Sequence, residues 1–127
     1  MIKILIIGSG GFLGAILRYY VSGYAQNISN SYSFPVGTLA VNLIGCFIIG
    51  VISKLADDLG LFSIETRLFL MIGILGAFTT FSTFGYETLS LLRDNEWLYA
   101  FLNVGLHLFL GIGAVWVGRS IVLLVWR

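Results

Sequence analysis

Hydroxyl side chains alternate with phenylalanines in an apolar part of this chain, and we call residues 79–84 the hydroxyl run. The surrounding sequence is GILGAFTTFSTFGYETL, whose polar members include Thr79, Thr80, Ser82, Thr83 and Glu87. In a membrane, hydroxyl groups can replace backbone partners where a helix is interrupted, and interruptions are tolerated only where they are buried or line an aqueous path. Freed carbonyls suit a small hard cation, whereas the amino-terminal end of a half-helix suits an anion. The hydroxyl run therefore predicts an ion site.

Phe81 and Phe84 add a second kind of group that can contact an ion. They are neighbours at i and i+3, so they lie near one face if the helix continues between them. An aromatic ring has a negative face and a positive edge. Ring edges that point into a narrow path would hold a poorly polarisable anion without offering it a full charge. The alternative interpretation is that both rings only pack against their neighbours.

The segments that carry these groups are expected to lie in lipid. Of the 127 residues, 58% are hydrophobic and only 10% are charged, whereas roughly a quarter of residues are charged in ordinary soluble domains. A spanning helix needs about 20 uncharged residues, and such stretches lie at 19–53, 68–86 and 97–118. We predict an all-α membrane protein with one transmembrane domain over residues 1–127 and four spans at about 3–24, 36–56, 67–92 and 97–124.

Small residues within the predicted spans indicate that the helices pack closely. Gly10 with Gly14, and Gly73 with Ala77, have the spacing that lets two helix backbones approach each other in lipid. The third span is expected to break at its centre, because the hydroxyl run has poor helix propensity. We therefore expect closely packed helices whose polar residues face protein.

Other classes of protein are not favoured by the sequence. The opening ILIIGSGGFLGA imitates the phosphate loop of a dinucleotide-binding enzyme, but no acidic residue follows before Asp57 to bind the ribose. The net charge of +1 provides no basic field for nucleic acid. The lone Cys46 cannot form a disulfide within the chain and is expected to serve helix packing. We expect the first apolar run to be a retained span, because no small-residue cleavage site follows a short core.

Three motifs together resemble the Fluc/CrcB family of small bacterial fluoride channels. They are GGFLGAILRY at 10–19, GTLAVNLIG at 37–45 and GAFTTFSTFGYE at 76–87. The likeness extends over the whole chain in length, number of spans and order of motifs. It implies an antiparallel, dual-topology homodimer with two pores, placed as a multi-pass protein in the bacterial inner membrane.

The resemblance also implies roles for single residues along an anion path. Phe81 and Phe84 resemble the paired phenylalanines whose ring edges meet fluoride. Asn42 resembles the amide donor on the path, because a neutral NH₂ group can replace part of a hydration shell without trapping the ion. The alternative for Asn42 is a hydrogen bond between helices, worth about 1 kcal/mol. Arg18 resembles the arginine that lies toward a vestibule and draws anions inward.

Further polar side chains are expected on this path. They are Thr38, Ser82, Thr83, Glu87 and His107. Glu87 matches a carboxylate at the end of the motif, and its alternative is a helix-surface residue near the interface. Relatives often carry Ser or Thr on the fourth span, where this chain has Asn103 and His107. His107 is expected to donate a hydrogen bond there, or alternatively to be a buried packing residue.

The expected break in the third span resembles the central sodium site of the family. In that site two backbone carbonyls from each subunit enclose one Na⁺ on the dimer axis, and position matching places them at Gly76 and Thr79. Many relatives have a second glycine where this chain has Ala77. The implied Na⁺ is structural and is not transported.

The implied function is a passive, fluoride-selective channel without enzymatic activity. HF enters a cell, dissociates in the cytoplasm, and the trapped anion leaves through the channel. The expected partners are fluoride, a second identical subunit and the lipid bilayer, but no nucleic acid. One rival is a small four-helix multidrug-type cation/proton transporter, but the first span lacks the carboxylate that it needs. The other is a structural subunit, in which Asn42, Phe81 and Phe84 would be replaceable.

Basic residues are divided unequally between the two ends of the predicted spans. One end would hold Lys3, Lys54, Arg67, Arg119 and Arg127, and the other would hold Arg18 and Arg93. This difference favours cytoplasmic termini by the positive-inside rule. A dual-topology protein would instead be expected to show near parity.

Overall fold

Four long helical segments make up most of the chain. The computed structural model describes residues 1–31 and 33–126, which form only helices and short connections. The segments long and apolar enough to cross a membrane are Ile2–Ser29, Val36–Asp57, Ile64–Arg93 and Trp97–Val125. These segments confirm the four predicted spans and extend the first past its predicted end at 24.

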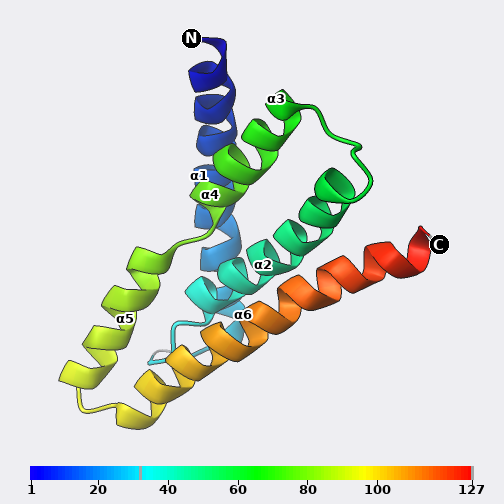
Figure 1. Cartoon of the computed structure of the whole chain (residues 1–127). Coiled ribbons are helices and arrows are strands. Elements are labelled where there is room, and N and C mark those ends of the chain that lie inside the picture. The colour runs from blue at the N-terminus through cyan, green and yellow to red at the C-terminus, as the bar shows by residue number, and fades with distance from the viewer. Residues whose placement is uncertain (32, 127) are drawn as a thin grey trace.

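The first, second and fourth segments are single helices, whereas the third is composite. The single helices are α1 (Ile2–Ser29), α2 (Val36–Asp57) and α6 (Trp97–Val125). The third segment consists of α3 (Ile64–Arg67), a π-helical stretch η1 (Leu68–Leu75), α4 (Gly76–Phe78) and α5 (Phe81–Arg93). In Figure 1 the start of α1 lies at the top and the end of α6 at the right, with the α2–α3 connection between them.

The connection between α1 and α2 is held by one side chain. Gln26 donates to the carbonyls of Ser31 and Phe34 at 2.5 and 3.2 Å. Its Oε1 accepts from the Gly37 N–H at 2.9 Å, which satisfies one of the donors that the start of a helix leaves free. α2 begins directly after Pro35, which cannot donate a backbone hydrogen bond.

Glycines bring the backbones of α1 and the third segment together, as their spacing predicted. A Cβ added to Gly10 would lie 2.6 Å from the Phe69 carbonyl oxygen and 3.0 Å from the Cα of Gly73. A Cβ added to Gly14 would lie 3.1 Å from the Cβ of Ala77. All three distances are shorter than ordinary van der Waals contact, so these two positions on α1 have no room for a side chain.

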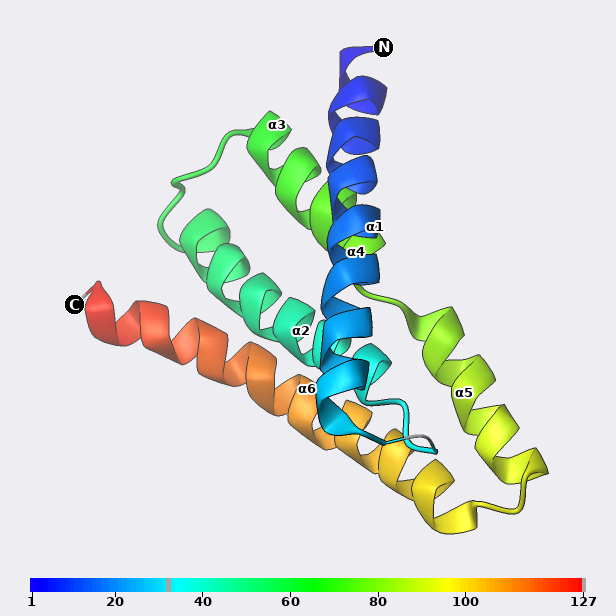
Figure 2. The same cartoon turned by 180° about the vertical axis from the view of Figure 1, so that it is seen from behind.

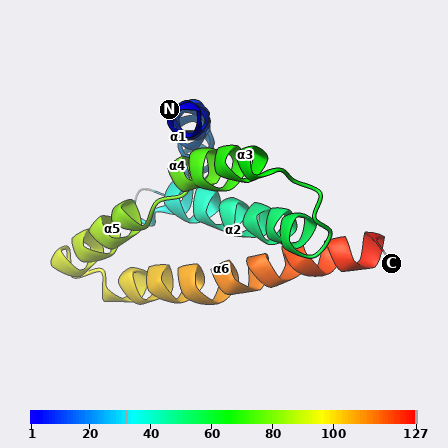
Figure 3. The same cartoon turned by 45° about the horizontal axis from the view of Figure 1, so that its top comes forward.

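α2 and α6 run side by side, while α5 diverges from α1 beyond the break (Figures 1 and 2). Figure 3 shows α5 reaching away from the other helices until the turn that leads into α6. The small core around Val41, Leu75 and Phe78 is packed by α1 and α2. The chain exposes 8195 Å², whereas a compact soluble protein of 13.9 kDa exposes roughly 6,700 Å². The chain therefore exposes more surface than a compact soluble protein of its size. Many large apolar side chains lie on this surface, where lipid or a partner could cover them.

Charged residues gather at the end of the molecule that holds the α2–α3 connection. Lys54 pairs with Asp58, and Arg67 pairs with Asp57 at 2.9 Å. Arg119 donates to Ser53 at 3.1 Å and lies 3.6 Å from Asp58. The predicted fifth basic residue, Arg127, lies outside the described residues.

Arg18 lies within the first span, as the predicted bounds of about 3–24 imply. It lies inside α1, well before the helix ends at Ser29, and its side chain is half-buried. Only loop residues enter the positive-inside comparison. Arg119 likewise lies inside α6, so neither arginine enters this comparison.

Candidate functional site

The third segment is interrupted at Thr79 and Thr80, which confirms the predicted break. Both residues are extended, with φ −88° and ψ 159° at Thr79 and φ −151° and ψ 114° at Thr80. Thr79 closes the first half by donating its hydroxyl to the Leu75 carbonyl at 2.9 Å. Thr80 caps the second half, because its Oγ1 accepts from the Thr83 N–H at 3.2 Å. The Thr80 hydroxyl therefore satisfies one donor at the start of α5, whereas the Thr79 hydroxyl adds a second bond to a carbonyl that the Thr79 N–H already reaches at 3.0 Å.

Asn42 holds the backbone of the break from α2. Its Oδ1 accepts from the Thr80 N–H at 2.8 Å, and its Nδ2 donates to the Thr80 carbonyl at 3.1 Å. In a continuous helix that N–H would bond to the Gly76 carbonyl. The amide keeps one further N–H that can be offered to an ion. Asn42 therefore makes the hydrogen bond between segments that was its alternative interpretation, and its contact with an ion stays a prediction.

One face of α5 borders two polar cavities. The first, about 610 Å³, lies near the break and is lined by Arg18, Thr38, Thr80 and Thr83. Thr38 also borders the second, about 710 Å³, which extends to the turn before α6. Polar groups therefore continue along α1, α2 and α5 from the break to one end of the molecule.

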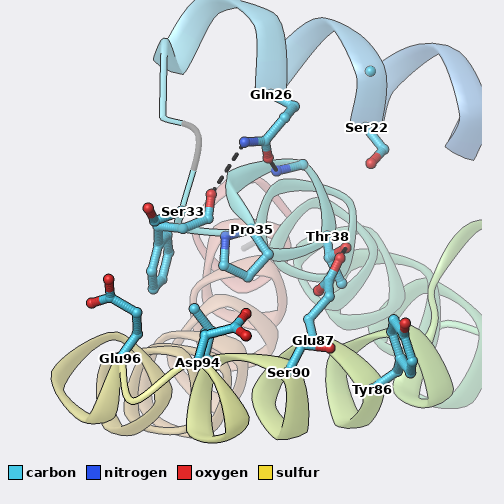
Figure 4. A pocket seen from close by; sticks show the side chains of 14 residues that line it. Ser22, Gln26, Ser33, Pro35, Thr38, Tyr86, Glu87, Ser90, Asp94 and Glu96 are labelled. Atoms are coloured by element: carbon cyan, nitrogen blue, oxygen red, sulfur yellow. Dashed lines mark hydrogen bonds between the residues drawn. The ribbon is translucent and has the colours of Figure 1, made fainter.

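The second cavity contains a hydrogen bond between two predicted site residues. Thr38 Oγ1 donates to Glu87 Oε1 at 2.6 Å, and Figure 4 shows these side chains directed at each other. The other carboxylate oxygen, Oε2, is buried without a partner in the described part of the chain. Asp94 and Glu96 add carboxylates at the outer end of this cavity (Figure 4). Its mouth is therefore acidic, whereas the deeper cavity holds the cation Arg18.

The two phenylalanines lie elsewhere on α5. The ring of Phe84 is 5.4 Å from that of Phe81 and 4.4 Å from the imidazole of His107 on α6. Phe81 is 83% exposed, and Ser82 is exposed beside it. The structure therefore divides the predicted residues between a cavity face and an aromatic face of α5, and no pore closes within the described part of one chain.

His107 donates within its own helix. Its Nδ1 lies 2.9 Å from the Asn103 carbonyl oxygen, which can only accept, so Nδ1 carries the proton. In the neutral ring Nε2 is then an acceptor, and it is buried without a partner among the described residues. In this chain His107 therefore bonds within its own helix, as in the packing alternative, and its expected donation to an anion path stays a prediction.

Two further polar residues were missed by sequence reasoning. Thr88 donates to the Phe84 carbonyl at 2.8 Å and accepts from Asn103 Nδ2 at 2.9 Å. Gln26 organises the start of α2, as described above. The sequence feature that could have indicated Thr88 is its position four residues after Phe84, which puts both residues on one helix face.

The carbonyls predicted to bind Na⁺ flank the break. Gly76 is exposed in the single chain, and the N–H that would normally occupy its carbonyl is turned toward Asn42. Oxygen is the right ligand type for a hard cation, which takes several such ligands. Two carbonyls fit as a partial site that needs further oxygens from outside this chain.

The fold and the polar break define a small four-span membrane protein. Residues 5–119 match the family described as "CrcB-like protein, Camphor Resistance (CrcB)". The chain belongs to this family, which confirms the resemblance drawn from the three motifs.

Named relatives cover nearly the whole chain. The chain is 48% identical to "Fluoride-specific ion channel FluC 3" of Methanosarcina barkeri over 97% of its own length and 92% of the relative. It is 48% identical to "Fluoride-specific ion channel FluC" of Methanococcus maripaludis, over 99% of this chain and 100% of the relative. It is 44% identical to the protein of the same name from Campylobacter fetus, over 94% and 92% of the two chains.

Proposed function

We propose that this protein is a fluoride-selective channel. The observation that carries the proposal is the near full-length identity to relatives named as fluoride-specific ion channels. The structure supports it through a broken helix that offers uncharged N–H and hydroxyl donors, together with a pair of phenylalanines beside the break. Neutral donors and ring edges suit a strongly hydrated anion, because they replace part of its water shell without holding it as a full charge would.

The channel would release fluoride from the cytoplasm and so relieve fluoride toxicity. A negative interior drives each anion outward with about 2.3 kcal/mol per 100 mV. HF enters by diffusion and dissociates at the higher cytoplasmic pH, which replenishes the anion inside. Passive flow down this gradient requires no energy source and no catalytic residue.

We propose an antiparallel homodimer as the functional unit. Phe81 is 83% exposed, and Ser82, Thr83 and Tyr86 are also exposed on α5 within a membrane-spanning segment. Polar side chains within a membrane usually face protein or water rather than lipid. A second copy would cover this face and place its own groups opposite Phe81 and Phe84, which would close the path that one chain leaves open.

The same contact would complete the partial cation site. Carbonyls of Gly76 and Thr79 from two chains would hold a structural Na⁺ at the dimer centre, where the ion would neutralise the converging carbonyl dipoles. The exposed Gly76 and the diverted Thr80 N–H support this placement.

Liposome efflux tests the channel proposal. We expect purified protein to release fluoride rapidly when valinomycin removes the opposing potential, with little release from matched chloride-loaded vesicles. Phe81→Ile and Phe84→Ile should each lower fluoride release at least about tenfold, because each removes one ring from the proposed path. Absence of fluoride release from folded wild-type protein would reject the proposed function.

A further inference from the structure

Asn103 is the most deeply buried polar residue on α6. Its exposed fraction is 0%, and its Nδ2 donates to the Thr88 hydroxyl on α5 at 2.9 Å. Thr88 uses its one hydroxyl hydrogen on the Phe84 carbonyl at 2.8 Å, so its oxygen is free to accept from Asn103. A hydrogen-bonded chain therefore runs from the second turn of α6 to the backbone of Phe84.

A second contact joins the same two helices one turn away. His107 lies four residues after Asn103, and its ring is 4.4 Å from the Phe84 ring, with the planes tilted by 44°. His107 is itself oriented by its bond to the Asn103 carbonyl. Asn103 therefore contacts Phe84 indirectly in two ways, through Thr88 to its backbone and through His107 to its ring.

α5 depends on such contacts for its position. The extended residues 79 and 80 separate it from α4, so it cannot take its direction from a continuous helix. Beyond the break it packs chiefly against α6. Rotation or sliding of α5 on α6 would move the Phe84 ring directly.

We propose that Asn103 and Thr88 are a positioning pair that sets the orientation of Phe84 for fluoride conduction. The inference rests on the proposed function, because it assigns meaning to the place of Phe84 on the anion path. Asn103 is fully buried and so contacts no ion in this chain, which separates its role from the pore-lining role that the sequence suggested for the fourth span. Thr88 acts through the carbonyl and the helix turn that carry Phe84.

Substitution of both partners can separate positioning from stability. Removing the Thr88 hydroxyl alone leaves a buried amide donor unpaired, which is destabilising. Replacing both partners by apolar residues of similar shape can be nearly neutral for stability. The double variant therefore removes the orienting bond without leaving the unpaired group.

The experiment compares fluoride efflux and thermal unfolding for the full chain. The variants are Thr88→Val, Thr88→Ser, the double variant Asn103→Leu with Thr88→Val, and Ser120→Ala as a control. Ser120 bonds to the carbonyl four residues earlier, as Thr88 does, but that hydrogen bond is exposed. We expect Thr88→Val to lower fluoride efflux about fivefold, which is about 1 kcal/mol when a tenfold change is 1.4 kcal/mol. Thr88→Ser should keep most of the wild-type efflux, and Ser120→Ala should match the wild type.

The double variant distinguishes a role in positioning Phe84 from a role in stability alone. We expect its unfolding temperature to return close to that of the wild type, while its fluoride efflux stays about fivefold low. Recovery of both quantities would overturn the inference, because the pair would then serve stability alone. Wild-type efflux from Thr88→Val would overturn it as well. Failure of the proposed function would be recognised separately, since the wild-type protein itself would then release no fluoride.

Discussion

Replacing Asn42 by leucine tests whether one side chain holds the break in the third segment. The substitution removes the acceptor for the Thr80 N–H at 2.8 Å and the donor to its carbonyl at 3.1 Å. Thr80 is only 8% exposed, so water does not readily replace either partner. An unpaired buried group costs about 1–3 kcal/mol, so loss of both partners should cost about 2–6 kcal/mol of unfolding free energy.

This expected loss exceeds that of an ordinary hydrogen bond between membrane helices, which averages about 0.6 kcal/mol. The reason is that Thr80 has left the helix and has no alternative backbone partner nearby.

Denaturant unfolding in detergent measures these differences. Asn27→Leu is the matched control, because Asn27 is exposed near the end of α1 and should change stability little. A loss below about 1 kcal/mol for Asn42→Leu, the size of a single ordinary hydrogen bond, would refute the reasoning and return Asn42 to a role in the ion path alone.

Three further predictions concern packing, charge and topology. Gly10→Ala should destabilise the chain by about 1–3 kcal/mol in denaturant unfolding, because the added methyl group meets backbone. Gly11→Ala should be neutral or stabilising, since nothing lies near its Cβ position, and equal losses at both glycines would contradict the packing. The hydrogen bond from Lys54 lowers the pKa of Asp58, so the stability that Asp58 provides is present above its usual range and lost as pH falls through its lowered pKa. The stability difference between wild type and Asp58→Asn should therefore shrink on acidification, and a constant difference would argue against this pair. For an antiparallel dimer, a cysteine added at the N-terminus of a Cys46→Ala variant should be labelled by an impermeant reagent from both sides of the membrane; labelling from one side alone would exclude dual topology.

Helix positions and the break could be predicted from the sequence because their causes are local. Uncharged run length defines a span, and the low helix propensity of residues 79–84, with hydroxyls able to cap both ends, defines the interruption. The contact of Gly10 with Gly73 was also foreseeable in kind, since small residues mark close helix approach. Which residues each glycine contacts could not be predicted from the sequence.

The division of site residues between the two faces of α5 was decided only by the tertiary structure. Asn42 meets Thr80 and Asn103 meets Thr88 because of the way the helices cross, and helical periodicity within one segment does not determine that crossing. The sequence likewise left two uses open for the Asn42 amide, and the structure assigns two of its groups to the backbone of the break. Local propensity determined where this chain must leave the helix, whereas contacts between distant segments determined which side chains satisfy the groups that the break exposes.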